Sequence, residues 1–294
     1  MLLVLCYLGT ILIWGSTWYL IKFQLGVVPV ELSSAYRFIL AAFILFGWCY
    51  WRGLNIKFSI KTHFTLLCMG FFMFSLNYIM FYCAASYVIS GLNAVLFSCV
   101  IFWNILNARL FLRQQVHLFI FIGATIGVSG LIFIFLPELL KVNFDRQFLI
   151  GVGFGSLGAF SASLGNILSA KHSRDGIGIT EGNAWGMLYG GIISFIIAMA
   201  QGKAIIFDFS LTYMSSLFYL VFFGSIVAFG CYLTLIKKIG ADKGAYALIL
   251  TPLVALIISQ FFESFVWTFW SFLGMILLIF GNIIILWGKK RKVS

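Results

Sequence analysis

The sequence has little charge, and acidic side chains are the scarcest part of it. Only 9% of its 294 residues are Asp, Glu, Lys or Arg, and Asp and Glu together number eight. Soluble domains carry about 25% charged residues, and a chain that is 63% hydrophobic has more apolar surface than one soluble core can bury. The shortage of charge therefore excludes a soluble globular domain and predicts a membrane protein whose solvent is partly lipid.

Acidic residues are also missing from the middle of every apolar run, so the sequence offers no members for a carboxylate proton relay. The six cysteines form no Cys-x-x-Cys pair and no cluster with histidine, and we interpret them as small apolar residues. We expect no cofactor and no bound metal. A Gly-x-Gly-x-x-Gly string begins at Gly153 but lies inside an apolar run. Its glycines predict close helix packing and not nucleotide binding, as do Gly123-x-x-x-Gly127 and Gly186-x-x-x-Gly190.

What the sequence has is long apolar runs, rich in Phe, Tyr and Trp. Crossing about 30 Å of hydrocarbon takes roughly twenty helical residues. Charged or turn-forming residues such as Pro29 separate the runs. The sequence predicts an all-α integral membrane protein of ten transmembrane helices, at residues 2–23, 31–51, 64–86, 90–112, 117–136, 149–170, 180–200, 213–236, 243–263 and 269–288.

The basic residues favour one orientation in the membrane. With both the N- and C-termini in the cytoplasm, fourteen of the nineteen Lys and Arg lie on the inner side and four lie outside, at Lys22, Lys141, Arg146 and Lys203. This asymmetry is typical of the positive-inside rule. The cluster from Lys289 to Lys292 directly follows the last apolar run. We therefore expect it to meet anionic membrane lipids and not nucleic acid.

The second half of the chain resembles the first. When the first half is shifted by 151 positions, Ala94 falls on Ala245 and Gly123 falls on Gly274. Because each half would contain five helices, an odd number, the two copies would be inverted in the membrane. We expect a first repeat at residues 1–136, a linker at 137–148 and a second repeat with a basic tail at 149–294. Inverted repeats are typical of carriers whose site lies near the bilayer midplane.

Several strings point to a known family. They are Trp14-Gly15-Ser16-Thr17-Trp18 with Ile21-Lys22, Tyr36-Arg37-Phe38 with Leu40-Ala41-Ala42, Asn77-Tyr78 with Phe81-Tyr82-Cys83-Ala84, and Thr251-Pro252-Leu253-Val254-Ala255. In this order the chain resembles the EamA branch of the drug/metabolite transporter superfamily along nearly its whole length. The resemblance implies ten helices in two inverted repeats, with a central cavity lined mainly by helices one, three, four, six, eight and nine. It also implies transport of amino acids, nucleotide sugars, drugs or other metabolites, often outward.

Uncharged polar side chains at mid-depth are the candidate substrate-binding residues, because each must find a hydrogen bond inside the bundle or in a water-filled cavity. Some of them would equally serve as contacts between helices, and the two roles stay open. The candidates are Trp14, Ser16, Asn77, Tyr78, Tyr82, Ser98, Ser163, Asn166 and Thr251, with Ser161 beside them.

A few ionisable side chains also fall in or near the predicted helices. The long stem of Arg37 would let its head reach the outer interface, or its guanidinium would contact an anion. Glu181 and Glu263 fall at helix ends, where we expect them to be solvated.

The expected function is that of a secondary transporter and not an enzyme. It would carry a small polar or amphipathic metabolite, an amino acid or related compound, outward across the inner (plasma) membrane by alternating access. Aromatic faces and uncharged donors suit an amphipathic, zwitterionic or weakly cationic solute. The alternatives are a membrane enzyme acting on lipid-linked substrates, which needs a cluster of Asp, His or Arg, and a channel, which needs a filter motif. The substrate, the physiological direction, ion coupling and the oligomeric state stay open.

Overall fold

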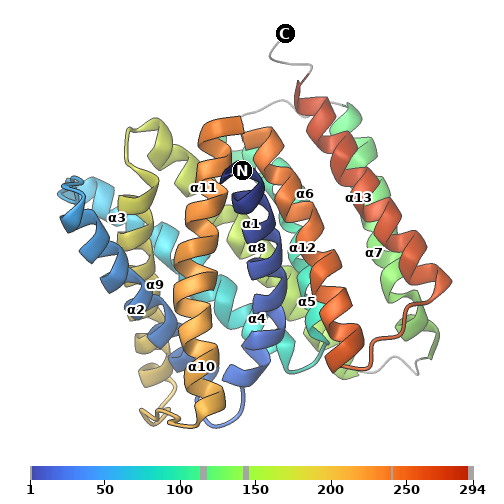
Figure 1. Cartoon of the computed structure of the whole chain (residues 1–294), viewed down its shortest axis with the longest axis horizontal. Coiled ribbons are helices and arrows are strands. Elements are labelled where there is room, and N and C mark those ends of the chain that lie inside the picture. Colours follow the sequence, from blue (N-terminus) through green and yellow to red (C-terminus); the bar gives the residue numbers. More distant parts are fainter. Residues whose placement is uncertain (1, 113–117, 142–145, 240, 291–294) are drawn as a thin grey trace.

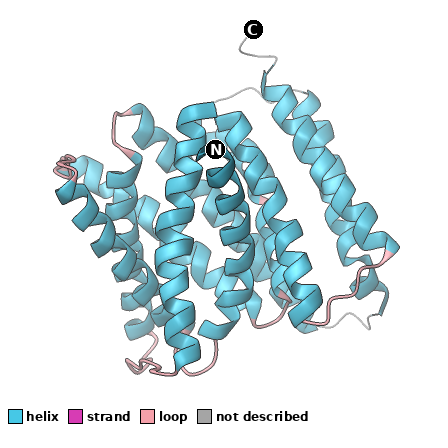
Figure 2. Ribbon diagram, in the orientation of Figure 1, coloured by secondary structure: helices cyan, strands magenta, loops and turns pink. Residues whose placement is uncertain are grey.

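The chain folds as a bundle of helices that run roughly side by side (Figure 1). The computed structural model describes residues 2–112, 118–141, 146–239 and 241–290, and within these ranges it contains no strand (Figure 2). The first half comprises α1 (Leu2–Leu20), η1 (Ile21–Gln24), α2 (Val30–Trp51), α3 (Ile60–Met69), η2 (Gly70–Leu76), α4 (Asn77–Ala85), α5 (Ser90–Ser98), α6 (Val100–Leu112) and α7 (Leu118–Lys141). The second half comprises α8 (Arg146–Arg174), α9 (Ile179–Ala200), α10 (Leu211–Tyr219), η3 (Leu220–Val227), α11 (Ala228–Ile239), α12 (Ala241–Phe262) and α13 (Phe269–Lys290).

Many of these helices can cross a bilayer. Within the described ranges, seven helical segments are long and apolar enough to do so, and three further apolar helices are shorter. Large apolar side chains on the outside of the bundle, such as Phe43 and Leu211, are well exposed, as expected where lipid is the solvent. The chain is therefore a multi-pass membrane protein. Ten crossings with both termini in the cytoplasm stay a prediction.

The observed ends of the two helices beside the predicted linker differ from the predicted ones. The sequence predicts that the fifth helix ends at residue 136 and that a linker covers 137–148. Instead α7 continues through Pro137 to Lys141, and α8 already begins at Arg146. A proline removes one backbone donor but does not prevent the residues after it from staying helical. The part of the predicted linker at 142–145 lies outside the described residues.

Helices α7 and α13 stand together at one side of the bundle (Figure 1). Glycines on both helices let them approach closely. A Cβ added at Gly274 would lie 2.5 Å from the carbonyl oxygen of Gly130, and one at Gly281 would lie 2.5 Å from that of Gly123. Both distances are shorter than real Cβ contacts allow. Close helix packing at small residues is confirmed for this pair. In the string that begins at Gly153, Gly155 and Gly158 also pack closely, but a Cβ at Gly153 would meet nothing within 4 Å, so the prediction is wrong for Gly153.

The contacts between the two halves come in corresponding pairs. α2 packs on α9, and α7 packs on α13. η2 packs on α9 while η3 packs on α2, α4 packs on α8 while α11 packs on α1, and α5 packs on α8 while α12 packs on α1. The wide-turn π-helices also correspond, since Gly70–Leu76 shifted by 151 positions covers 221–227, within η3. Exchanging the halves therefore turns each of these contacts into another observed contact.

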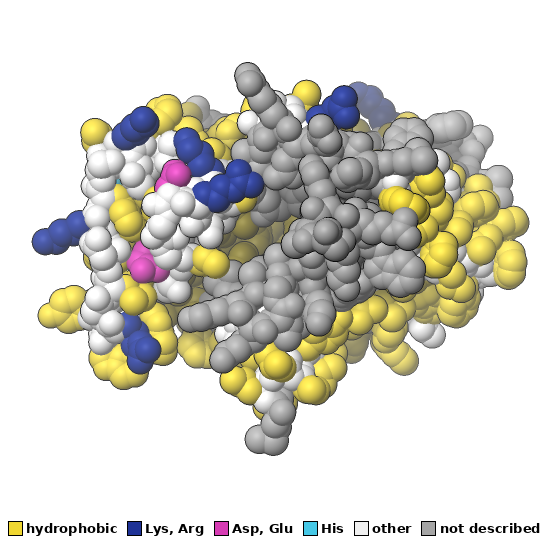
Figure 3. Space-filling model, turned by 90° about the horizontal axis from the view of Figure 1, so that it is seen from above, with side chains coloured by type: hydrophobic (Ala, Val, Ile, Leu, Met, Phe, Trp, Pro, Cys, Tyr) yellow, Lys and Arg dark blue, Asp and Glu magenta, His cyan; other side chains and the backbone are white. Residues whose placement is uncertain are grey.

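Both ends of the described chain lie toward the same end of the bundle, at the top of Figure 1. Figure 3 looks onto that end and shows Lys and Arg side chains on its described part, while hydrophobic side chains cover the flanks. This arrangement fits the loop charges from which the sequence predicts the membrane orientation.

Candidate functional site

Each of the two π-helical segments, η2 and η3, presents a backbone carbonyl to a side-chain donor. The Asn77 Nδ2 donates to the Met73 carbonyl oxygen at 3.0 Å, and the Trp14 Nε1 donates to the Gly224 carbonyl oxygen at 3.0 Å. Met73 and Gly224 are 151 positions apart, so they are corresponding residues of the two halves. In the first half Ser161 adds a bond to the Phe72 carbonyl oxygen at 2.7 Å. Single π-helical turns inside α-helices are often found at functional sites.

Trp14 is held in one orientation by aromatic neighbours from the second half. Its ring centroid lies 5.1 Å from that of Phe229 and 5.3 Å from that of Tyr232. Two residues further on, the Ser16 hydroxyl is 2.8 Å from the Tyr219 hydroxyl. Helix α1 is thus joined to the helix formed by α10, η3 and α11 by polar and aromatic contacts at the same depth, and two of the predicted site residues make these contacts.

Arg37 is buried, with 2% of its surface exposed. The interpretation that its head reaches the outer interface is therefore wrong. Its Nε donates to the Ser225 hydroxyl at 3.0 Å, and its guanidinium carbon lies 4.7 Å from the Tyr78 ring centroid and 5.2 Å from that of Phe38. The contacts with Tyr78 and Ser225 come from α4 and η3 and draw the side chain into the bundle, which the sequence of α2 alone could not indicate.

Three buried polar atoms, one on Arg37 and two on α4, make no well-formed hydrogen bond to any described residue. They are the Arg37 Nη1, the Tyr82 hydroxyl and the Asn77 Oδ1. Tyr82 is fully buried, and its hydroxyl is near enough to Arg37 for the two groups to interact electrostatically. A buried polar group without a partner costs free energy. The cluster of Trp14, Arg37, Tyr78 and Tyr82 is therefore suited to contacting a polar solute.

A second row of polar side chains joins α6 to α8. The Asn107 Nδ2 donates to the Ser163 hydroxyl at 2.9 Å, and the Asn166 Nδ2 donates to the Asn104 Oδ1 at 3.3 Å. Ser163 and Asn166 are predicted site residues, whereas Asn104 and Asn107 are not. Both were visible as amides within an apolar run, but the sequence does not say which face of a helix they occupy.

Two further predicted site residues bond within their own helices, as Asn77 does with the Met73 carbonyl four residues before it. Ser98 donates to the Ala94 carbonyl oxygen at 3.4 Å, and Thr251 donates to the Leu248 carbonyl oxygen at 2.8 Å. Such local bonds satisfy a hydroxyl inside a membrane helix without any ligand. Ser98 and Thr251 are thus the weakest candidates, while Trp14, Ser16, Tyr78 and Tyr82 meet around η3.

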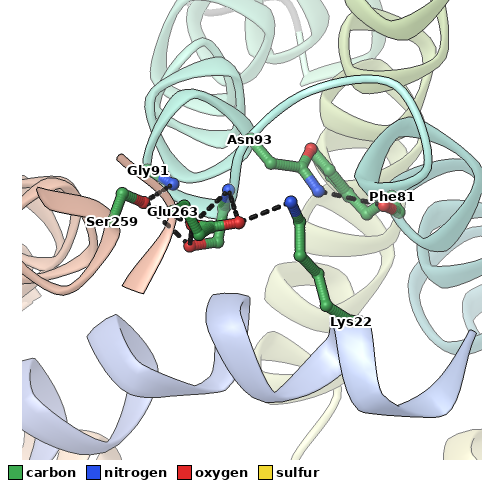
Figure 4. Close-up of polar contacts among 7 residues, drawn as sticks. Lys22, Phe81, Gly91, Asn93, Ser259 and Glu263 are labelled. Atoms are coloured by element: carbon green, nitrogen blue, oxygen red, sulfur yellow. Dashed lines mark hydrogen bonds and ion pairs between the residues drawn. The ribbon is translucent and has the colours of Figure 1, made fainter. Parts of the chain in front are cut away.

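An ion pair closes the opposite end of the bundle from the chain ends (Figure 4). The Lys22 Nζ lies 2.5 Å from the Glu263 Oε1, and 6% of the Glu263 side chain is exposed. The same carboxylate accepts from the Ser90 backbone N–H at 3.0 Å, from the Ser90 hydroxyl and from the Ser259 hydroxyl at 2.6 Å. The expectation that Glu263 is solvated is therefore wrong.

This network ties three elements together. Ser90 begins α5, Ser259 belongs to α12, and Lys22 lies in η1. The Ser259 hydroxyl also accepts from the Gly91 backbone N–H at 2.7 Å. Burial raises the pKa of the Glu263 carboxyl, but the hydrogen bonds from Lys22, Ser259 and Ser90 outweigh it and hold the pKa below its ordinary value. A separate ion pair joins Lys203, which follows α9, to Glu31 of α2 at 2.7 Å.

The described residues include no group of three or more His, Cys, Asp or Glu side chains that could hold a metal ion. Arg37 forms neither of the two ion pairs of the described chain, which both lie near the ends of helices. The cluster of Trp14, Arg37, Tyr78 and Tyr82 therefore offers hydrogen-bond donors, aromatic faces and one positive charge, and these groups can bind a solute.

Comparison with known proteins shows that the chain is similar to several bacterial transporters. The inner membrane transporter YedA of Escherichia coli (strain K12), itself uncharacterized, is 24% identical over 281 residues, or 95% of this chain and 88% of YedA. The uncharacterized transporter YoaV of Bacillus subtilis is 26% identical over 251 residues, or 83% of each chain. An uncharacterized transporter of Buchnera aphidicola is 24% identical over 90% of this chain and 85% of its own.

A solved crystal structure has the same fold, with a TM-score of 0.71 and 14% identity over 99% of both chains. The sequence model of the EamA-like transporter family matches residues 1–136 and again 149–287. Family and relatives point to a membrane transporter rather than an enzyme. The chain therefore belongs to the EamA-like transporter family, as the resemblance of its sequence strings predicts.

Proposed function

We propose that this protein is a secondary carrier that moves a small polar or amphipathic metabolite, an amino acid or related compound, outward across the inner membrane by alternating access. The observation that carries the proposal is the exchange symmetry of the two halves around a polar centre. Corresponding π-helical turns of the two halves, in η2 and η3, present the Met73 and Gly224 carbonyls to side-chain donors.

Two inverted five-helix repeats explain this symmetry. The matching helix pairs and the two separate stretches matched by the family model both support the division. In such carriers one repeat rocks against the other around a fixed site near the midplane. The Trp14, Arg37, Tyr78 and Tyr82 cluster lies where helices of both halves meet, which is where that mechanism needs the substrate.

The inner membrane is proposed because the relative YedA is named an inner membrane transporter and because basic residues are concentrated in the loops of one side. A path without ATP hydrolysis fits the absence of a nucleotide-binding motif, since the glycines around Gly153 lie inside α8. Movement would then be driven by the solute gradient or by exchange.

Counterflow tests the proposal. The purified protein is reconstituted in liposomes loaded with unlabelled solute, and uptake of labelled amino acids, polyamines and nucleosides is followed without ATP. We expect saturable accumulation of at least one solute, strongly reduced by Trp14→Ala. Phe43→Ala is the matched control, since Phe43 is 63% exposed on the outside of the bundle. Flux that rises linearly with solute and never saturates would instead indicate a channel.

A further inference from the structure

Arg37 is a buried positive charge with no counterion among the described residues. The ion pairs of the described chain use Lys22 and Lys203, and both lie near the ends of helices. Arginine stays protonated in proteins, and a buried charge is stable only when it is paired or fully hydrogen-bonded. The Arg37 Nη1 has neither kind of partner. An anion is the group whose chemistry would complete this site.

The surroundings of Arg37 fix the guanidinium and leave one side of it unmatched. Ser225 accepts from Nε, and the Tyr78 and Phe38 rings flank the guanidinium plane. Nη2 lies 3.2 Å from where a Cβ on Gly224 would be, so this glycine lets the guanidinium reach η3. The carbonyl of the same Gly224 accepts from Trp14. Arg37 thus ends at the same turn of helix as the Trp14 indole.

A second donor stands beside the guanidinium. The Tyr82 hydroxyl is fully buried and lies close enough to Arg37 for a weak hydrogen bond, but it makes no well-formed hydrogen bond to any described residue. A planar guanidinium and a neighbouring hydroxyl together present donors to one small anion, and carboxylates match the guanidinium edge well. Because Arg37 supplies a single positive charge, an anion with a single negative charge would balance it.

We propose that Arg37 Nη1 and the Tyr82 hydroxyl bind the carboxylate of the transported solute, so that the substrate class is a monocarboxylate or zwitterion such as an amino acid. The inference rests on the carrier function proposed above and deepens it. The Tyr78 ring beside the guanidinium and the Trp14 ring at Gly224 then face the remainder of the solute, where aromatic surfaces favour an apolar group or an ammonium.

The test compares each acid with its amide. Aliphatic and aromatic amino acids and the matching amino acid amides compete for counterflow in the same liposomes. The wild type is expected to favour the acid, and Arg37→Gln and Tyr82→Phe are expected to weaken competition by the acid roughly 10- to 100-fold, as for the loss of a hydrogen bond to a charged group. Competition by the amide should change little. Arg52→Gln is the matched control, because Arg52 stacks on Trp48 and Trp51 on the exposed surface.

Several results would overturn the inference. If the wild-type protein does not distinguish acids from amides, the inference is overturned, and this result does not depend on whether Arg37→Gln folds. An Arg37→Gln protein that is monodisperse in detergent and transports acids with wild-type half-saturation would also overturn it. Counterflow of polyamines or nucleosides alone would leave the carrier in place and remove the carboxylate site. Absence of counterflow with every solute would remove both proposals.

Discussion

At the scale of single residues, the chain positions uncharged donors against backbone carbonyls that belong to π-helical turns. Trp14 donates to Gly224, and Ser161 donates to Phe72. The residues themselves could be chosen from the sequence, because polar groups at mid-depth must find partners. Their partners could not be, since the widened turns of η2 and η3 leave no mark in the residue pattern.

Trp14→Phe and Ser161→Ala should each destabilise the protein by about 1 kcal/mol, the usual net value of one hydrogen bond. Trp14→Phe keeps an aromatic ring beside Phe229 and Tyr232 and removes only the donor. Thermal unfolding in detergent measures the loss. Ser215→Ala is the control, because the exposed Ser215 hydroxyl bonds only within its own helix. A melting temperature unchanged from that of the control would contradict this prediction.

Glu263 was misjudged from the sequence for a related reason. Its position at the end of a helix is typical of a solvated carboxylate. Yet Lys22 and Ser90 approach it from two other parts of the chain, and Ser259 approaches it from the preceding turn of α12. Burial depends on which helix ends meet, and a local pattern does not encode that. The same holds for Arg37, whose partners lie on α4 and η3.

The pKa of the Glu263 carboxyl lies below its ordinary value because hydrogen bonds from Lys22, Ser259 and Ser90 outweigh its burial. The stabilisation this gives is complete above the pKa of the unfolded chain and is lost as the pH falls through the lower pKa of the folded protein. Melting temperature measured against pH should therefore fall on acidification. Glu263→Gln should lose part of this dependence, whereas Asp175→Asn at an exposed site should keep it. Identical acid profiles for Glu263→Gln and the wild type would refute the assignment.

At the scale of elements, glycine sets how closely α7 and α13 pack. Gly123-x-x-x-Gly127 was identifiable in the sequence as a packing motif, and its partner is Gly281 on α13. The ten apolar runs each correspond to a helical stretch, with ends that differ by a few residues. The ends of the helices were harder to predict from the sequence. Charged and turn-forming residues mark where an apolar run stops, but a helix can continue past that point, as α7 does past Pro137.

Gly274→Leu should separate α7 from α13. Its Cβ alone would lie 2.6 Å from the Ile134 backbone nitrogen, a contact that only backbone movement relieves. Overpacking of this kind costs roughly 1 to 3 kcal/mol. Gly153→Leu is the matched control, since a Cβ there meets nothing within 4 Å. Size-exclusion chromatography and thermal unfolding should show a loss for Gly274→Leu and none for Gly153→Leu, and equal behaviour would contradict the packing argument.

At the scale of the whole molecule, the two halves form corresponding contacts around one centre, and the central claim is that they move against each other. The repeat could be proposed from the offset of 151 residues, because Gly123 and Gly274 occupy corresponding positions. The hydrogen-bond network around Glu263, at the end of the bundle opposite the chain ends, could not be predicted from the sequence, because Glu263, Lys22 and Ser90 come from separate helices. Alternating access requires that this end open, so α5 and α12 must part there.

The most direct measurement locks that end. The Ser90 and Ser259 hydroxyl oxygens are 2.9 Å apart, so Ser90→Cys with Ser259→Cys brings two thiols within range of a disulfide. Counterflow is measured for the double variant before and after oxidation, with both single variants as controls. The account predicts that oxidation abolishes counterflow only in the double variant and that reduction restores it. Full counterflow with the disulfide formed would contradict alternating access through this end.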